Sequence, residues 1–417
     1  MPNTAQGRYS ASVDLLRRAR TVIPGGVWGH NRMPSALDPD ELPWFADCGR
    51  GARLRDVDGH WYVDYICGYG AIINGYARPE IDDAVRDQAL RGSTLSQATA
   101  KTVELAELLV DLVDGMAWAA WGANGSDATW TALTMARAHT GRPHVAQVVN
   151  AYHGSHSWNG PADPGQGRPG QDTSLVHQVR WNDVAALDEL FARHGDELAA
   201  FVVTPYHHPI PGDAEFATPE WRDALNTHCR RTGTLLVVDD VRAGFRLDLR
   251  GSHAAFGFHA DLVCFSKGLG NGWPLSAVMG TEAIRKTSEQ IFLAGTFWNS
   301  ANSMAAALAN LTLLRDEEGV KKMQHSGELL TSGLRRIAER NGVPMQVTGP
   351  VAMPSVTVRD DDQKWMRRFA VHMAAQGTLL HAGHNWALST AHTPELVEET
   401  LTHAETAMAR AQEDLGR

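Results

Sequence analysis

The sequence lacks several features that would assign it to a specialised class of proteins. Its four cysteines show no C-x-x-C spacing, so neither a zinc site nor a disulfide framework is indicated, and we expect no metal site. No stretch approaches about 18 uninterrupted apolar residues, and residues 1–20 contain no apolar signal segment. The formal charge of −10 disfavours a nucleic-acid or membrane partner, because such surfaces need a clustered basic patch. We therefore expect a cytoplasmic protein with a small-molecule partner.

The length and composition are those of a folded chain with two domains. At 417 residues, with 43% hydrophobic and 21% charged residues, the chain can form one large core and one smaller core. Between about residues 56 and 308, short apolar runs alternate with helix-period segments, which indicates an α/β fold with a mainly parallel sheet covered by helices. The predicted strands are Val145–Val149, Ala200–Thr204, Leu235–Asp239, Leu262–Phe265 and Ser276–Gly280. The predicted helices of this part include Thr102–Val113 and Ser126–His139.

The remaining segments indicate a second, smaller domain. Longer helices are predicted near the C-terminus, over Gly319–Asn341, Asp362–Gln376 and Pro394–Gln412. The stretch Gly51–Tyr65 indicates a hairpin, because Asp58-Gly59 supplies a turn between alternating apolar positions. We predict a large domain over residues 62–308 and a small α+β domain built from residues 1–61 and 309–417.

Three local patterns complete the prediction of the fold. Thr218-Pro219 and Thr393-Pro394 each combine an N-cap threonine with proline at the first helical position, so both should open helices. The Gly- and Pro-rich stretch Gly160–Gly170 predicts one long loop, of the kind that often borders a site.

Lysine is scarce, so a lysine in an unusual position is informative. Five of the six lie on predicted polar helix faces or ends, where a solvated charge is the ordinary explanation. Lys267 instead follows the predicted strand Leu262–Phe265 and precedes a glycine-rich segment, Gly268–Gly272, that we expect to be mobile. This position suits a Schiff-base lysine, whose amine must be partly desolvated to be nucleophilic at neutral pH. Taken alone, the position leaves both explanations open.

An acidic residue ends a neighbouring predicted strand. Asp239 closes the apolar strand Leu235–Val238, and open α/β sheets bind ligands at the carboxyl ends of their parallel strands. A carboxylate there can keep the nitrogen of a pyridine cofactor protonated, so that the ring withdraws electrons from a substrate. The alternative is an aspartate that caps the next turn. Asp240 should face the other way and have a structural role.

Two further patterns suit the same kind of cofactor. Gly125-Ser126 opens the predicted helix Ser126–His139, and the free N–H groups at a helix start can bind phosphate. The aromatic ring of Tyr152, after the predicted strand Val145–Val149, could lie against a planar ring. Each pattern also has an ordinary explanation, as a helix cap and as a loop or core residue.

These patterns occur in a definite order along the chain, and together they resemble a known family. The sequence is similar to class III, fold type I enzymes that use pyridoxal 5′-phosphate (PLP), and most similar to the branch of glutamate-1-semialdehyde aminomutase and its aminotransferase relatives. The matching segments are Pro24–Val27, Asp56–Gly59, Asn124–Thr129, Ala136–Arg142, Tyr152–Gly154, Asp239–Val241, Gly244–Arg246, Ser266–Lys267 and Gly295–Phe297.

The resemblance implies a role for each cofactor-binding residue. Gly125 and Ser126 would hold the phosphate, Tyr152 would stack on one face of the PLP ring, and Val241 would pack on the other face. Asp239 would pair with the ring nitrogen.

The resemblance also implies that two chains share each site. Lys267 would form the Schiff base with PLP, and Thr296 would reach the phosphate bound by the neighbouring subunit. A homodimer with shared active sites is therefore expected.

The residues expected to bind substrate depart from the family pattern. Arg32 stands eight residues after Pro24, where the family has a carboxylate-binding arginine, and Arg242 replaces a neutral residue after Val241. His384 aligns, within a residue or two, where the aminomutase carries a glutamate. Other departures are Asp127, Thr204-Pro205 and Asp240, where the family usually has glutamate, Glu-Pro and glutamate. Tryptophans expected to border the site are Trp28, Trp158, Trp298 and Trp386.

The function that these residues favour is that of an aminotransferase. Lys267 would act as nucleophile and then as the base that moves a proton between the substrate α-carbon and the cofactor, while Asp239 sustains the electron-withdrawing ring. The amino group would pass from an amino-acid-like donor to a keto or aldehyde acceptor. An aminomutase or a racemase on the same scaffold is the alternative, and a non-enzymatic PLP-binding module is a third hypothesis that Lys267, Asp239 and Tyr152 argue against.

Overall fold

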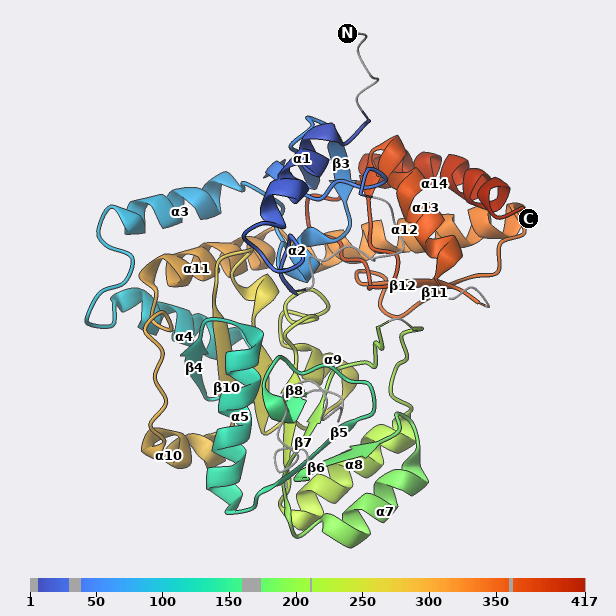
Figure 1. The fold of residues 1–417 in the computed structure, drawn as a ribbon. Coiled ribbons are helices and arrows are strands. Elements are labelled where there is room, and N and C mark those ends of the chain that lie inside the picture. The colour runs from blue at the N-terminus through green and yellow to red at the C-terminus, as the bar shows by residue number, and fades with distance from the viewer. Residues whose placement is uncertain (1–6, 30–38, 160–173, 211, 360–362, 417) are drawn as a thin grey trace.

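The centre of the molecule is a seven-stranded sheet covered by helices (Figure 1). The computed structural model describes residues 7–29, 39–159, 174–210, 212–359 and 363–416. The strand order is β4-β10-β9-β8-β7-β5-β6, and β10 runs antiparallel to both neighbours whereas the other pairings are parallel. The strands are β4 (Trp118–Gly122), β5 (His144–Val148), β6 (Val176–Val179), β7 (Leu198–Val203), β8 (Leu235–Asp239), β9 (Leu262–Phe265) and β10 (Ser276–Gly280). The α/β fold with a mainly parallel sheet is confirmed.

The central strands are apolar throughout because both faces of this sheet are covered. In β8, Leu236 and Val238 belong to one buried cluster, while Leu235 and Val237 belong to another. This alternation follows from the two-residue period of a strand. The first cluster includes residues of α4, α7, α8 and α11, and the second includes the buried face of α5. The sheet is thus fixed between two layers of helices.

The helices of this part begin and end near the predicted positions. Thr218 caps α8, since its hydroxyl accepts a hydrogen bond from the Trp221 N–H at 3.3 Å. The predicted helix Thr102–Val113 corresponds to α4, and Ser126–His139 corresponds to α5. The helices are α2 (Cys67–Gly70), α3 (Pro79–Ala89), α4 (Ala100–Leu112), α5 (Gly125–Thr140), α7 (Val184–His194), α8 (Pro219–Thr232), α9 (Ser252–Phe256), α10 (Glu282–Gln290) and α11 (Ala301–Asp316), with the 3-10 turns η2 (Ser157–Asn159) and η4 (Lys267–Leu269).

A second region joins the two ends of the chain. Its four-stranded sheet has the order β1-β2-β3-β13, so a strand near the C-terminus pairs with β3, in parallel. The predicted hairpin corresponds to the antiparallel pair β2 and β3. The strands are β1 (Ala46–Arg50), β2 (Arg53–Asp56), β3 (Trp61–Asp64), β11 (Met345–Thr348), β12 (Ser355–Val358) and β13 (Thr378–Leu379), and the helices are α1 (Ser10–Ala19), α12 (Gly319–Arg340), α13 (Lys364–Gln376) and α14 (Pro394–Asp414).

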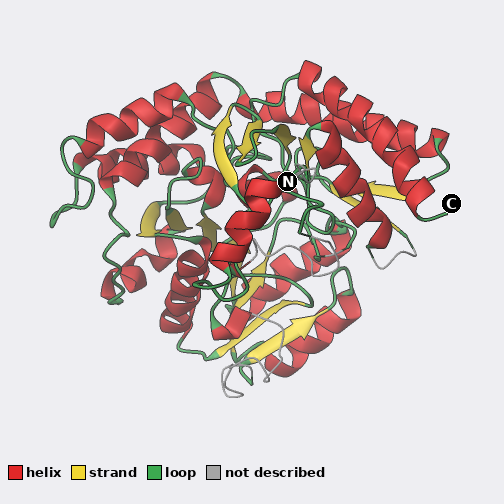
Figure 2. Ribbon diagram, turned by 45° about the horizontal axis from the view of Figure 1, so that its top comes forward, coloured by secondary structure: helices red, strands yellow, loops and turns green. Residues whose placement is uncertain are grey.

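This second region has its own hydrophobic core. The core combines residues of β3 with residues of α12, α13 and α14, and the three helices gather beside the C-terminus (Figures 1 and 2). Such a core supports a second domain built from both ends of the chain. Its strand β3 lies across the predicted boundary between residues 61 and 62, and the division into residues 62–308 and residues 1–61 with 309–417 stays a prediction. The loop predicted over Gly160–Gly170 lies outside the described residues. Within the described part of the chain, no helix is both long and apolar enough to cross a membrane.

Candidate active site

The predicted lysine and acid lie at the carboxyl ends of two adjacent parallel strands. Asp239 is the last residue of β8 and pairs in register with Cys264 of β9, and Lys267 follows the end of β9 by two residues. Lys267 is partly buried, and desolvation of its amine, together with the positive charge of Arg242, lowers the pKa of this amine to about 7. The charge of Asp239 partly opposes that shift. A large fraction of the amine is therefore neutral near pH 7, as a nucleophile requires.

The backbone at Lys267 is held in a conformation that few side chains adopt. Its φ is +45°, in the left-handed region that costs a non-glycine residue on the order of 1 kcal/mol. The Asn310 side chain donates hydrogen bonds to the carbonyl oxygens of Gly268 and Leu269, at 2.8 and 3.0 Å. At Gly270 an added Cβ would lie 2.4 Å from the Trp273 carbonyl oxygen. The expectation of a mobile glycine segment was wrong, because these contacts fix the turn that presents Lys267.

Asp239 and Asp240 face different surroundings, as expected from the alternation of a strand. Both oxygens of Asp239 accept hydrogen bonds, from the Val241 N–H at 3.1 Å and from the His153 ring at 2.8 Å. Asp240 instead accepts a hydrogen bond from the Ser252 N–H at 2.7 Å, and burial raises its pKa to about 7. The sequence reasoning had given His153 no role, although its place in Tyr152-His153-Gly154 was a signal.

The start of α5 packs closely against Val241. Asn124 caps this helix, because its side-chain oxygen accepts a hydrogen bond from the Asp127 N–H at 3.1 Å. A Cβ added to Gly125 would lie 2.7 Å from Cγ1 of Val241, so only glycine fits here. The Ser126 hydroxyl accepts a hydrogen bond from the Ser155 N–H at 3.0 Å. The predicted phosphate-binding pair and the predicted ring-packing valine are therefore neighbours in space.

Tyr152 and Arg242 contact each other beside these groups. The Tyr152 side chain is 52% exposed, and Cζ of Arg242 lies 5.7 Å from the centre of its ring. Nη1 of the Arg242 guanidinium lies 3.3 Å from Nδ1 of His208. Desolvation lowers the pKa of this guanidinium. A partly buried cation thus lies near Lys267, with an imidazole and an aromatic face as its neighbours.

His384 belongs to a group of rings near the same cation. Its ring packs edge-on against Tyr69, with ring centres 5.5 Å apart, and His381 lies 5.9 Å away. Burial, followed by the charges of Arg242 and Lys267, lowers the pKa of His384 to about 3. Where the aminomutase pattern would give a carboxylate, this chain thus has an uncharged imidazole at neutral pH.

Other predicted site residues lie elsewhere or outside the described chain. Arg32 is among the residues that the structure does not describe. Thr296 is exposed on the loop after α10. The tryptophans have different surroundings: Trp28 is exposed, Trp158 and Trp386 are buried, and Trp298 donates a hydrogen bond to Asp127 at 3.2 Å.

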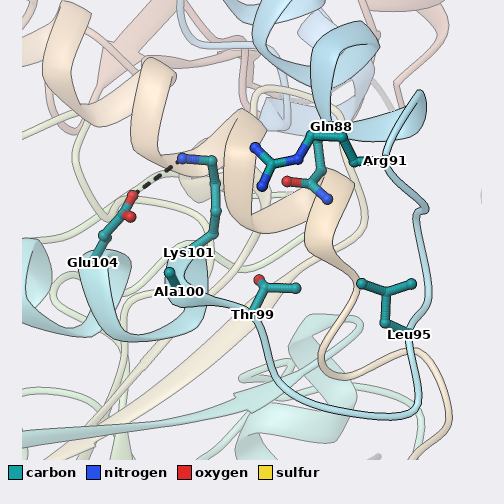
Figure 3. A pocket seen from close by; sticks show the side chains of 7 residues that line it. All are labelled: Gln88, Arg91, Leu95, Thr99, Ala100, Lys101 and Glu104. Carbon is teal, nitrogen blue, oxygen red and sulfur yellow. Dashed lines mark hydrogen bonds and ion pairs between the residues drawn. The ribbon is translucent and has the colours of Figure 1, made fainter.

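A cavity of about 170 Å³ lies between α3 and α4 and is separate from this group of residues (Figure 3). None of the predicted site residues lines it. Of its two lysine and arginine side chains, Lys101 is already paired with Glu104 at 3.1 Å. The lining residues are Gln88, Arg91, Leu95, Thr99, Ala100, Lys101 and Glu104.

The residues at the strand ends fit the cofactor predicted from the sequence. The first N–H groups of a helix such as α5 can bind a phosphate. The close contact between Gly125 and Val241 leaves no room for a larger residue at position 125. The nearly neutral amine of Lys267 suits a Schiff base, and the Asp239 carboxylate suits a pyridine nitrogen. The chain thus brings together a helix start, a carboxylate and an amine of the kinds that PLP requires.

Comparison with known proteins identifies the family. The model of the family described as aminotransferase class III matches residues 35–410. This match spans most of the chain, which therefore belongs to the class III aminotransferases. The resemblance stated from the sequence and the expectation of an aminotransferase are confirmed at this level.

Several relatives are similar over nearly their whole length. An aminopentol aminotransferase of Sphingopyxis macrogoltabida is 38% identical over 96% of this chain and 94% of its own. A glutamate-1-semialdehyde 2,1-aminomutase of Methanopyrus kandleri is 32% identical over 97% of this chain and 99% of its own. Among solved structures, the PLP internal aldimine form of the FumI protein of Sphingopyxis sp. MTA144 matches with a TM-score of 0.93 and 38% identity, covering 97% of both chains. The fold type I architecture is thus confirmed.

Proposed function

We propose that this class III aminotransferase uses PLP bound to Lys267 to move an amino group from an amino-acid-like donor to a keto or aldehyde acceptor. The observation that carries the proposal is the position of the partly buried Lys267 and of Asp239 at the ends of adjacent strands, where desolvation lowers the pKa of the Lys267 amine to about 7. The relatives named as aminotransferases support the same reaction.

Each of these residues would have its own role in binding PLP or in the reaction. Gly125 and Ser126 hold the phosphate at the start of α5, while Val241 and Tyr152 confine the ring. Asp239 keeps the ring nitrogen protonated, which PLP requires in order to withdraw electrons from the substrate. The Lys267 amine would act as the base that takes a proton from the substrate α-carbon and returns it to the cofactor.

Arg242 is the described residue best suited to bind a substrate carboxylate. It is partly buried, and its charge acts on the amine of Lys267. A guanidinium can bind both oxygens of a carboxylate through parallel hydrogen bonds. Arg32 is the second candidate for this role, and His384 would contact the substrate through its uncharged ring.

We further propose a homodimer in which Thr296 of one chain reaches the phosphate held by the other. The loop that carries Thr296 also exposes Phe292 and Phe297, which are 91% and 65% exposed. Exposed aromatic side chains of this kind favour a covering surface. A cytoplasmic location stays a prediction.

The reaction is tested with a panel of amino donors, including amino acids and aminopentol, with and without a keto-acid acceptor. Turnover that requires the acceptor and yields the aminated acceptor supports amino-group transfer. An isomerised product without an acceptor would contradict it and indicate an aminomutase, and inverted stereochemistry at the α-carbon would indicate a racemase.

The carboxylate-binding role is tested by Arg32→Ala and Arg242→Ala. The variant that removes the carboxylate contact should lower kcat/KM for carboxylate-bearing donors by the equivalent of roughly 2–5 kcal/mol, as when one partner of a buried charge pair is lost. Amines without a carboxylate should be affected little. Equal losses for both kinds of donor would instead indicate a role in folding or cofactor binding.

A further inference from the structure

Arg242 contacts an imidazole that comes from the neighbouring strand end. Nη1 of its guanidinium lies 3.3 Å from Nδ1 of His208. Because a guanidinium only donates hydrogen bonds, Nδ1 of His208 is the acceptor, and the hydrogen of the neutral ring is on Nε2. His208 follows β7 and Arg242 follows β8, and these two strands are parallel neighbours in the central sheet. The contact therefore joins two adjacent strand ends on the side of the sheet where the proposed site lies.

The protein fixes His208 in place. The residue is 6% exposed, and the ring of Tyr206 packs edge-on against its imidazole, with ring centres 5.0 Å apart. The carbonyl oxygen of Tyr206 accepts a hydrogen bond from the Thr204 hydroxyl at 2.8 Å. The backbone of His207 pairs with that of Glu215 through two hydrogen bonds of 2.8 Å. The segment after β7 is thus held by its own contacts and presents the imidazole in one orientation.

An uncharged acceptor suits a guanidinium that is to bind an anion. Burial and the charge of Arg242 hold the pKa of His208 well below its usual value, so the ring remains an acceptor at neutral pH. A carboxylate in its place would neutralise Arg242, and a second cation would repel it. The contact uses one of the five N–H donors of the guanidinium. Enough donors remain for the two parallel hydrogen bonds that a substrate carboxylate can accept.

We propose that His208 is a positioning residue that holds the Arg242 guanidinium in place for the carboxylate of the amino donor, and so determines the preference for carboxylate-bearing donors. The inference rests on the proposed role of Arg242 in binding that carboxylate. A long side chain loses rotamer freedom when it binds a ligand. With one N–H already bound to His208, part of this ordering occurs on folding, and the substrate is bound with a smaller loss of entropy.

Three substitutions of His208 should have different outcomes. His208→Leu removes the acceptor, and His208→Gln moves the side-chain acceptor away from the position of Nδ1. His208→Asn keeps a carboxamide oxygen near that position. For a carboxylate-bearing donor, the Leu and Gln variants should raise KM about tenfold or more at a nearly unchanged kcat, as expected when a hydrogen bond to a charged group is lost from substrate binding. The Asn variant should keep a KM close to that of the wild type.

The choice of donor separates positioning from a general loss of structure. Each protein is also assayed with an amine in which a methyl group replaces the carboxylate, as isopropylamine does for alanine, and the KM for this amine should not change. His207→Gln is the matched control, because it removes the neighbouring imidazole, which stacks on Trp181 with ring centres 5.6 Å apart. This control should leave both KM values close to those of the wild type.

A second readout requires no turnover. Hexanoate, a carboxylate without an amine, is titrated into the PLP-loaded protein, and its dissociation constant is measured by calorimetry. The Leu and Gln variants should bind hexanoate about tenfold more weakly than the wild type, whereas His208→Asn and His207→Gln should bind it almost as well.

The possible failures are distinguishable. If Arg242→Ala weakens both kinds of donor equally, or leaves the binding of hexanoate unchanged, the proposed role of Arg242 is wrong and the inference about His208 is overturned with it. If Arg242→Ala acts only on carboxylates but the Leu and Gln variants do not, only the role of His208 is overturned. An Asn variant as impaired as the Gln variant would also overturn it, and this comparison stands even if His208→Leu does not fold.

Discussion

The inner and outer sides of the proposed site are built in different ways. On the inner side, Asp239 is buried at the end of β8 and Lys267 is partly buried after the end of β9, and hydrogen bonds from His153 and Asn310 hold their surroundings. On the outer side, Thr296 lies exposed on a loop between α10 and α11. The packing of the single chain therefore holds the inner side, whereas Thr296 would be covered only by the second subunit of the proposed homodimer.

The comparison indicates which residues would act in the reaction and which would act in the contact between subunits. Desolvation lowers the pKa of the Lys267 amine. This desolvation arises because Lys267 lies beside the hydrophobic core of the central sheet. The loop of Thr296 contacts the inner side through a hydrogen bond from Trp298 to Asp127 in the first turn of α5. We therefore expect changes on the inner side to abolish the reaction, and changes on the outer side to weaken cofactor binding in a way that depends on a second subunit.

The largest effect is expected for Lys267→Ala. Loss of the proposed nucleophile should lower turnover by several orders of magnitude. The purified wild-type protein should be yellow, and borohydride should fix the cofactor on the peptide that contains Lys267. A Lys267→Ala protein with normal turnover would show that the inner side has been assigned to the wrong residues.

Asp239→Asn should have the next largest effect, with Asp240→Asn as its matched control. An amide cannot keep the pyridine nitrogen protonated, so the rate should fall by about a hundredfold or more while the phosphate contacts still retain PLP. The pKa of Asp240 is raised to about 7 by burial, so a neutral amide there replaces a group that is already partly neutral, and turnover should remain close to that of the wild type. Steady-state kinetics and the PLP content of both proteins check this, and equal losses would remove the distinction between the two carboxylates.

Thr296→Val tests the outer side. Removing a hydrogen bond to a phosphate should weaken PLP binding about tenfold or more, as measured by titration of the cofactor-free protein. When Thr296→Val chains are mixed with Lys267→Ala chains, shared sites predict that each mixed dimer regains one site with both native residues. Recovery of turnover on mixing supports the shared site, and mixtures no more active than the sum of their parts would contradict it.

The smallest expected effect is the pH dependence of the rate at which the cofactor-free protein binds PLP. Only the neutral amine attacks PLP, so the loading rate of the cofactor-free protein should reach half its maximum near pH 7 and fall about tenfold per pH unit below it. Because the charge of Arg242 helps to lower the pKa of Lys267, Arg242→Gln should move this midpoint to higher pH. Stopped-flow absorbance measures both, with the amine of a lysine peptide, pKa about 10.4, as the reference. A midpoint near that of the peptide would mean that Lys267 is not desolvated.

Several features of this protein were determined by the sequence alone. The apolar runs of β8 and β9, the cap at Thr218 and the order of the cofactor motifs predicted the sheet, a helix start and the residues of the site. These features depend on periodicity, capping and residue type, which are local properties of the chain.

Only the tertiary structure decided how these residues act on one another. Neither the contact of His153 with Asp239, 86 residues away, nor the hydrogen bonds from Asn310 to the turn after Lys267 follow from periodicity or residue type. The glycine-rich segment suggested mobility, yet contacts from α11 hold it, because a loop takes its rigidity from what packs on it and not from its own composition. The lowered pKa of Lys267 likewise arises from burial and from Arg242 of another strand end, and desolvation exists only once the layers of the fold have closed around the amine.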